Sequence, residues 1–196
     1  QQPGWAPDSR RLVYSDDREG RYHLYLYDFV AHEERRLTTG PANDLTPVWS
    51  PDGKSLAYVH AGEELHVLAL DPKSAKSDGP PSDRLVATAR LDRAPFVSER
   101  SIVWSPDSKW IAYATSGGSK LFANAYVVSA AGGEAHPVSF LSNTNADALG
   151  WSPDGTFLLL VSSQRTEPGV LARVDLVPRT PRFREDQFRD LFSPDA

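Results

Sequence analysis

Short stretches in which apolar and polar residues alternate, separated by polar turns, run through the whole chain. The two-residue period of a half-buried β-strand recurs at 10–15, 23–28, 55–59, 65–70 and 110–114. Further strands are predicted at 35–38, 46–49, 84–87, 125–128, 136–140, 156–161 and 170–177. The segments between them are rich in Gly, Pro, Asp and Ser, which favour tight turns. The pattern therefore predicts an all-β protein of many short strands.

One phrase recurs among these strands: Trp, then Ser or Ala, then Pro and Asp, then Gly or Ser. It begins at Trp5, Trp49, Trp104 and Trp151, in steps of 44, 55 and 47 residues, and a weaker copy at Phe192 follows after 41 more. Proline presets φ for a turn, and the Asp side chain can bond back to nearby backbone N–H groups. A repeat of roughly 40–50 residues built from short strands is typical of β-propeller blades.

The repeat divides the chain into four units of up to four strands each. The expected blades are 1–45, 46–99, 100–146 and 147–181, with 182–196 as a tail or the start of a further blade. An insertion at 71–83, rich in Pro, Ser, Lys and Gly, explains the long second step. Because one small sheet cannot bury both of its faces, neighbouring units must stack. We therefore expect a β-propeller segment of about four four-stranded blades, part of a larger propeller.

The repeated residues of the phrase are interpreted as structural. Each Trp ends an inner strand and is expected in the core, and each Asp belongs to the turn that follows. These motif residues are Trp5, Asp8, Trp49, Asp52, Trp104, Asp107, Trp151 and Asp154. Ser50, Ser105 and Ser152 recur beside them because the turn favours a small hydroxyl, so they are expected to be turn residues rather than nucleophiles.

Composition argues against several functional classes. The 196 residues carry 21 Lys and Arg against 26 Asp and Glu, a net charge of −5 with no basic stripe, so nucleic-acid binding is not expected. No apolar run approaches the roughly 20 residues that span a bilayer. No Cys is present, which excludes a thiolate metal site or a Cys nucleophile. The chain starts without Met and shows no signal peptide, so residue 1 is not expected to be a native start.

The sequence contains no recognisable catalytic or metal-binding motif. It has no G-x-S-x-G elbow and no H-E-x-x-H, and its five histidines are scattered. We therefore expect no catalytic residue, no metal ion and no cofactor in this segment. Arg18 and Arg165 occupy matching places in loops between second and third strands and are candidates for contact with a peptide or a partner domain. A salt bridge within the loop is the alternative interpretation.

The four W-[SA]-P-D-[GS] phrases resemble the TolB-type blade repeat, a WD-repeat-like unit. That repeat occurs in TolB, in tricorn-type serine peptidases, and in the propellers of prolyl oligopeptidase and dipeptidyl peptidase relatives. The segments 162–169, 172–181 and 183–192 are also similar to a late part of the N-terminal propeller of bacterial tricorn-like peptidases. The resemblance implies a non-catalytic segment that gates, holds or scaffolds peptide substrate. The catalytic residues of such peptidases lie far downstream, outside this sequence.

Two alternatives to a tricorn-like peptidase stay open. One is a TolB-type interaction propeller of the bacterial envelope with no enzyme attached, and the other is the propeller of a prolyl oligopeptidase-like enzyme. The expected partners are a peptide or neighbouring protease domains, together with self-association through open blade edges. A periplasmic or extracellular location is favoured over a cytoplasmic one. The segment itself is not expected to be an enzyme, whereas the parent protein is expected to be a serine peptidase.

Overall fold

The computed structural model describes residues 3–70, 82–91, 102–116, 122–141, 145–164 and 167–177, and the regular structure within them consists of β-strands. The strands form four antiparallel sheets, each built from consecutive strands. Sheet 1 contains β1 (Gly4–Trp5), β2 (Arg11–Asp16), β3 (His23–Asp28) and β4 (Glu33–Arg36). Sheet 2 contains β5 (Asp44–Trp49), β6 (Ser55–His60), β7 (Glu64–Ala69) and β8 (Asp83–Thr88). Sheet 3 contains β9 (Ile102–Trp104), β10 (Trp110–Ser116), β11 (Ala123–Ser129) and β12 (His136–Pro137). Sheet 4 contains β13 (Asn145–Trp151), β14 (Phe157–Gln164) and β15 (Glu167–Asp175).

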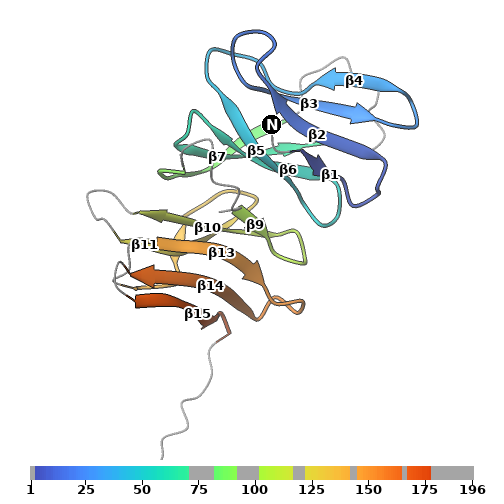
Figure 1. Cartoon of the computed structure of the whole chain (residues 1–196). Helices are drawn as coiled ribbons and strands as arrows, with labels where there is room; N and C mark the ends of the chain where they lie inside the picture. Colours follow the sequence, from blue (N-terminus) through green and yellow to red (C-terminus); the bar gives the residue numbers. More distant parts are fainter. Residues whose placement is uncertain are drawn as a thin grey trace, which may run out of the picture.

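The sheets follow one another along an open arc, with sheets 1 and 4 at opposite ends of the molecule (Figure 1). The first strands of consecutive sheets contact each other: β1 contacts β5, β5 contacts β9, and β9 contacts β13. Small antiparallel sheets whose first strands gather in this way are blades of a β-propeller. The chain therefore forms a partial, open propeller.

The hydrophobic core lies at the junctions between sheets. Between sheets 1 and 2, Val13 and Leu24 pack against Trp49 and Leu56. The corresponding clusters at the other two junctions include Val59, Leu65, Ile102 and Trp104, and then Ala112, Leu149, Leu158 and Leu160. Since sheet 2 is covered on both faces, β6 is buried at four consecutive positions, as in strands that have no solvent-facing side.

The strands lie close to where the alternating pattern predicts them, with differences at the outer strands. The pattern predicts a strand at 136–140, but β12 contains only two residues. The Ser139 hydroxyl accepts the Ala125 N–H at 2.9 Å, so a side-chain bond replaces the regular ladder there. Sheet 4 has three strands among the described residues instead of four. The greater part of the predicted insertion, 71–81, and the predicted tail lie outside the described residues.

The sequence predicts core positions for all four motif tryptophans, and the structure differs at one of them. Trp49 is 8% exposed and Trp104 is 7% exposed, which confirms the prediction for these two. Trp151 is partly buried. Trp5 is 57% exposed, so the prediction is wrong there. Each of the other three faces the preceding sheet, whereas Trp5 belongs to the first sheet and has no earlier sheet to pack on among the described residues.

Candidate functional site

The Trp-Ser-Pro-Asp turn is a closed hydrogen-bonded unit. In sheet 2, the Ser50 hydroxyl donates to Asp52 Oδ1 at 2.6 Å and accepts the N–H of Ser55 at 2.9 Å. Asp52 Oδ1 also accepts the N–H of Lys54 at 3.0 Å. Sheet 3 repeats the three bonds at the equivalent residues, with distances of 2.6, 2.9 and 3.1 Å. The hydroxyl proton of each serine is engaged by its own turn, so these serines are turn residues, as their repetition predicts.

The fifth residue of each phrase adopts a left-handed backbone. The angle φ is 56° at Ser9, 69° at Gly53, 60° at Ser108 and 70° at Gly155. Glycine accepts this conformation freely, whereas an L side chain costs roughly 1–2 kcal/mol. Ser108 gains a compensating contact, because its hydroxyl accepts the N–H of Asp52 in the neighbouring turn at 3.1 Å. The serine therefore links the turns of sheets 2 and 3.

A second repeated contact joins each sheet to the one before it. Three such bonds occur: Trp49 Nε1 donates to the Gly4 carbonyl (3.0 Å), Trp104 Nε1 to the Val48 carbonyl (3.0 Å), and Trp151 Nε1 to the Val103 carbonyl (3.2 Å). In each case the acceptor is the residue immediately before the motif Trp of the preceding sheet. Sequence reasoning missed these bonds, because they join residues 45 to 56 positions apart. The motif Trp is thus both an apolar contact and a hydrogen-bond link between blades.

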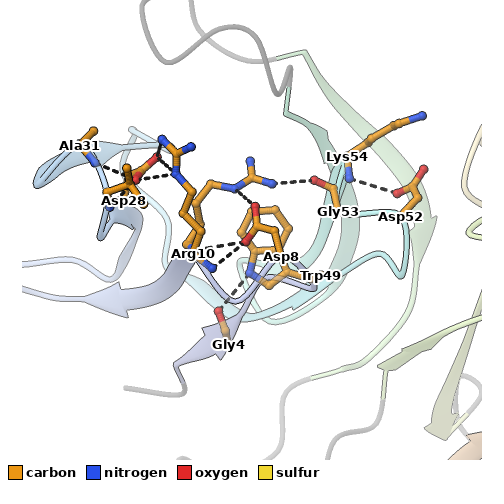
Figure 2. A network of polar contacts seen from close by, with 11 residues as sticks. Gly4, Asp8, Arg10, Asp28, Ala31, Trp49, Asp52, Gly53 and Lys54 are labelled. Atoms are coloured by element: carbon orange, nitrogen blue, oxygen red, sulfur yellow. Dashed lines mark hydrogen bonds and ion pairs between the residues drawn. The ribbon is translucent and has the colours of Figure 1, made fainter.

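Polar contacts reinforce the junction of sheets 1 and 2 (Figure 2). Trp49 packs beside Gly4, and a Cβ added at Gly4 would lie 3.7 Å from the indole, at ordinary van der Waals distance. The Arg11 guanidinium carbon lies 4.9 Å from the Trp49 ring centroid, and its Nη2 donates to the Gly53 carbonyl at 3.2 Å. Arg11 Nε donates to Asp8 Oδ2 at 2.8 Å. Arg11 therefore ties the first turn to the second sheet.

A groove of about 460 Å³ lies between sheets 2 and 3, beside the turn of sheet 3. Its walls include the buried Trp104 and the 40% exposed Trp110, together with several serines. The charged residues among its described lining are Arg84 and Lys109, with no carboxylate. This volume is within the range of ligand pockets, roughly 300–1,000 Å³. An aromatic face, hydroxyls and two cations suit a ligand that carries a carboxylate.

Trp110 also lines a neighbouring groove of about 420 Å³ between sheets 3 and 4. This second groove has Asp107 and Asp154 in its described lining, and no Lys or Arg. Hydrogen bonds from the Ser152 hydroxyl and from Thr156 lower the pKa of Asp154 to about 2, so its carboxylate is ionised at neutral pH. Two grooves of opposite charge therefore flank one exposed tryptophan.

A buried carboxylate links the far ends of sheets 1 and 2. Asp44, the first residue of β5, is 1% exposed and lies between two histidines. His60 Nδ1 is 2.7 Å from Asp44 Oδ1, and His23 Nδ1 is 3.5 Å from Asp44 Oδ2. Burying a polar group is costly unless it is hydrogen-bonded. Because His23 belongs to sheet 1, the pairing holds the two sheets together.

His66 on β7 lies within hydrogen-bond distance of two carboxylates. Its Nδ1 is 2.9 Å from Asp83 Oδ2, and its Nε2 is 3.1 Å from Glu64 Oε2. Both ring nitrogens can donate only in the charged form. The hydrogen bond to Asp83 accordingly raises the pKa of His66, against the opposing effect of burial. Burial acts to raise the pKa of Asp83, but the bond from His66 and its charge hold that pKa below its usual value.

The His66 cluster has the character of a structural ion cluster, because both imidazole nitrogens are engaged. In the described part of the chain, no group of three or more His, Asp or Glu side chains is arranged to hold a metal ion. The described residues also contain no helix that is long and apolar enough to cross a membrane.

The structure places Arg18 in a network within sheet 1. Its guanidinium contacts Asp16 at 3.0 Å and Glu34 at 2.7 Å, and lies 4.3 Å from the Tyr25 ring centroid. Hydrogen bonds to Asp16 and Glu34 raise the pKa of Arg18 above its usual value. The loop salt bridge given as the alternative is therefore present, and contact with a peptide or partner domain stays a prediction. Arg165 lies outside the described residues.

Comparison with known proteins connects the chain to peptidases and to TolB. The family described as "Dipeptidyl peptidase IV (DPP IV) N-terminal region" matches residues 18–139. The uncharacterized peptidase YuxL of Bacillus subtilis is 44% identical over 63 residues, which cover 31% of this chain and 10% of the peptidase. The match is therefore confined to less than a third of this chain and to a small part of that protein.

Solved structures show the same fold. TolB from Acinetobacter baumannii matches with a TM-score of 0.63 and 19% identity, over 90% of this chain and 41% of TolB. The tricorn protease matches with a TM-score of 0.63 and 13% identity, over 89% of this chain and 18% of the protease. These likenesses confirm the predicted β-propeller fold and its resemblance to TolB and the tricorn protease. The chain spans less than half of either solved chain.

Proposed function

This chain belongs to the family of dipeptidyl peptidase IV N-terminal regions. We propose that it is a non-catalytic propeller segment of a tricorn-like serine peptidase. In that protein it gates, holds or scaffolds peptide substrate. The observation that carries the proposal is the groove of about 460 Å³ between sheets 2 and 3. It combines aromatic, hydroxyl and cationic side chains without a carboxylate among the described lining.

The two grooves together suit a short extended peptide. Trp110 offers an exposed aromatic surface on which an apolar side chain of a peptide can pack. Different apolar side chains can make this contact, so it requires little sequence preference. Arg84 and Lys109 attract a carboxylate on one side, while Asp154 attracts an amine on the other. Asp107 Oδ2 lies 3.9 Å from Lys109 Nζ, so these two residues pair with each other at the boundary of the grooves. A peptide lying across Trp110 would place opposite charges in opposite grooves. Recognition of this kind tolerates many sequences, as a segment serving a broad peptidase requires.

A non-catalytic role agrees with the state of the repeated serines. Peptide hydrolysis by a serine enzyme needs a hydroxyl within hydrogen-bond reach of a general base. The hydroxyls of Ser50 and Ser105 instead donate to Asp52 and Asp107 inside closed turns, and both serines are buried. We therefore assign peptide-bond cleavage to a part of the parent protein outside this sequence.

The test is to incubate the chain with a mixed library of short peptides and to score retention and cleavage by mass spectrometry. We expect weak retention of many peptides and no cleavage. Trp110→Ala should weaken retention roughly tenfold, the size of one lost aromatic contact. Lys109→Glu should shift retention away from peptides with a free carboxylate. Phe140→Ala is the matched control, because Phe140 is 81% exposed and does not line the groove.

The outcomes separate this function from its alternatives. Cleavage that a single serine substitution abolishes would overturn the non-catalytic assignment. Tight binding of one folded protein, with no peptide retained, would favour a TolB-type interaction propeller, for which the likeness to TolB is the supporting observation. That likeness also supports a periplasmic or extracellular location as part of the proposal. The proposed partners are peptides, neighbouring protease domains and a further copy of the chain.

A further inference from the structure

The junction of sheets 1 and 2 contains a guanidinium that belongs to the chain itself. Arg11 stands six residues after Trp5, and its guanidinium carbon lies 4.9 Å from the ring centroid of Trp49, the motif tryptophan of the next sheet. Its Nη2 donates to the Gly53 carbonyl at 3.2 Å, and its Nε donates to Asp8 Oδ2 at 2.8 Å (Figure 2). An indole face, a carbonyl and a carboxylate oxygen therefore form a binding site for one guanidinium.

The junction of sheets 3 and 4 repeats these groups without the guanidinium. Trp151, Gly155 and Asp107 occupy the same places in their own phrases, and all three line the groove of about 420 Å³ between the two sheets. The place of Arg11 is taken by Trp110, which lines the same groove and is 40% exposed. This groove therefore offers the groups that bind a guanidinium, and its described lining contains no Lys or Arg.

The two junctions also agree in their backbone geometry. Gly53 and Gly155 have φ angles of 69° and 70°. A Cβ added at Gly53 would lie 3.7 Å from Pro7 Cδ and 3.7 Å from Arg11 Nη2. A Cβ added at Gly155 would lie 4.0 Å from Cδ of Pro106, the equivalent proline, and apart from its own chain neighbours no further described atom would lie within 4 Å. The space that the guanidinium fills at the first junction is therefore open at the third.

The carboxylates of this groove can accept further donors. Asp107 Oδ1 is engaged by its own turn, whereas Asp107 Oδ2 lies 3.9 Å from Lys109 Nζ, beyond hydrogen-bond distance. Both side chains are more than half exposed, and exposed pairs of this kind are weak, so a guanidinium can take the place of the ammonium. A hydrogen bond from the Ser105 hydroxyl lowers the pKa of Asp107, so this carboxylate is ionised at neutral pH, as Asp154 is.

From this comparison we propose that the groove between sheets 3 and 4 binds the guanidinium of an arginine side chain in a peptide, in the position that Arg11 holds at the first junction. The guanidinium packs on the indole of Trp151 beside Trp110. Its N–H groups donate to the Gly155 carbonyl and to Asp107 Oδ2. The inference rests on the proposed function, because it names the class of peptide that the segment holds.

Arginine suits this groove better than lysine does. A guanidinium is planar, stacks on aromatic rings and carries five N–H donors in a fixed fork, so one group can serve a carbonyl and a carboxylate at once. A lysine ammonium is a compact, strongly hydrated point charge with three donors. The lining supplies two indoles and two carboxylates, and a cation over a tryptophan face is attracted by the ring. Peptides that contain arginine should therefore be held in preference to those that contain lysine.

The test measures the binding of otherwise identical short peptides with arginine, lysine or citrulline at one central position, by isothermal titration calorimetry. Citrulline has nearly the shape of arginine but no charge. We expect the arginine peptide to bind roughly threefold to tenfold more tightly than the lysine peptide, and roughly tenfold more tightly than the citrulline peptide. Asp107→Asn and Asp154→Asn should each reduce the advantage of arginine over citrulline by roughly threefold or more and leave the citrulline peptide unaffected.

Asp52→Asn is the matched control. Asp52 accepts the same bonds from its serine and from a backbone N–H in the turn of sheet 2, and it lines neither groove. This variant should leave the affinities of all the peptides unchanged. Circular dichroism checks that each variant folds, and the comparison among peptides uses the unchanged chain, so it does not depend on the variants.

A small probe, N-acetyl-argininamide, separates this inference from the proposed function when its binding is followed by saturation-transfer NMR. Equal binding of all the peptides, or an arginine preference that neither groove variant reduces, would overturn the inference and leave the peptide-holding function standing. If no peptide binds but the probe binds, and binds less to Asp107→Asn, the proposed function fails and the guanidinium site stands. If neither the peptides nor the probe bind, both are wrong.

Discussion

Sheets 1 and 3 begin with nearly the same phrase, yet its tryptophan has opposite environments in the two sheets. Trp104 is 7% exposed, packs in the cluster between sheets 2 and 3, and donates its N–H to the Val48 carbonyl at 3.0 Å. Trp5 is 57% exposed and stacks on Phe29. The phrase therefore specifies a turn and an aromatic side chain aimed at a neighbouring sheet. Whether that side chain contributes to stability depends on whether a sheet lies there.

The turns themselves also differ between these two sheets. In sheet 3, the Ser105 hydroxyl accepts the N–H of Trp110 at 2.9 Å. Ala6 stands at the equivalent place in sheet 1 and has no hydroxyl, and the N–H of Arg11 is bonded to Asp8 Oδ1 at 3.3 Å instead. In sheet 1 the Asp8 carboxylate thus accepts the backbone N–H that the serine hydroxyl accepts in sheet 3. One turn geometry is reached with two different sets of hydrogen bonds.

The largest expected difference between the two sheets concerns the tryptophans. Trp104→Ala should lower the free energy of unfolding by about 3–5 kcal/mol, the range for removal of a large buried aromatic residue. Trp5→Ala should lower it by less than about 1 kcal/mol in the monomer, because surface substitutions have small effects. Urea denaturation at a concentration where light scattering shows a monomer would measure both. Equal losses at the two positions would contradict the exposed placement of Trp5.

The next difference concerns the serine hydroxyl. Ser105→Ala should lower the free energy of unfolding by about 1–3 kcal/mol, because it leaves a part-buried N–H of Trp110 without its partner. Ala6→Ser, the reciprocal change in sheet 1, should raise stability by at most about 0.5–1.5 kcal/mol, the net value of one hydrogen bond. Thermal unfolding followed by circular dichroism would compare the pair. A larger effect at Ala6 than at Ser105 would show that the two turns are not built as described.

A smaller difference should appear at the fifth residue of the phrase. Ser9 and Ser108 both have positive φ, at 56° and 60°. Ser9→Gly should stabilise the fold by roughly 0.5 kcal/mol, since it relieves the left-handed strain at some cost in chain entropy. Ser108→Gly relieves the same strain but removes the acceptor for the Asp52 N–H, so it should be neutral or destabilising. If both variants were stabilising to the same degree, the link between turns would have no energetic value.

The smallest effect is expected from His66, and it should depend on pH. Because the folded-state pKa of His66 is raised, its stabilisation is present below its unfolded pKa and is lost as the pH rises through the raised value. The pKa of Asp83 is lowered, so its contribution is present above the unfolded pKa of Asp and is lost at lower pH. His66→Gln should therefore cost most stability between about pH 4 and pH 6.5.

The control for this measurement is His136→Gln, since His136 is an exposed histidine on β12. The measurement compares the denaturation midpoints of the two variants and the unchanged protein across the pH range. The loss of stability in His66→Gln should be largest between about pH 4 and pH 6.5. A difference between His66→Gln and the unchanged protein that stays constant with pH would show that the ion cluster does not form.

Local chemistry explains why much of the fold could be predicted. The strands were predictable because apolar and polar residues alternate with the period of the strand itself. The turns were predictable because proline, aspartate and the small fifth residue act within a span of a few positions, as the bond from Ser50 to Asp52 illustrates. Stacking of blades followed as well, since a small sheet must cover its faces. The resemblance to TolB and tricorn-type peptidases rests on the same short phrase.

The candidate site was not predictable in the same way, because its contacts join distant segments. Three kinds of contact join different strands. They are the contacts of Asp44 with His23 and His60, the linings of the two grooves beside Trp110, and the hydrogen bonds from each indole to the preceding sheet. The sequence placed Arg18 in the loop between two strands, as observed, but only the structure shows that Asp16 and Glu34 bind its guanidinium.

By itself, then, the sequence determined the strands, the turns and the need for stacked sheets, since each follows from residues close together in the chain. Only the tertiary structure decided which tryptophan is buried. Trp5 and Trp104 are followed by similar residues, but only Trp104 is covered by a preceding sheet among the described residues. That sheet contains Val48, which is 56 positions from Trp104 in sequence, and the Val48 carbonyl oxygen lies 3.0 Å from the Trp104 indole nitrogen. A side chain is buried when another segment covers its surface, and the local sequence does not determine where a distant segment will lie.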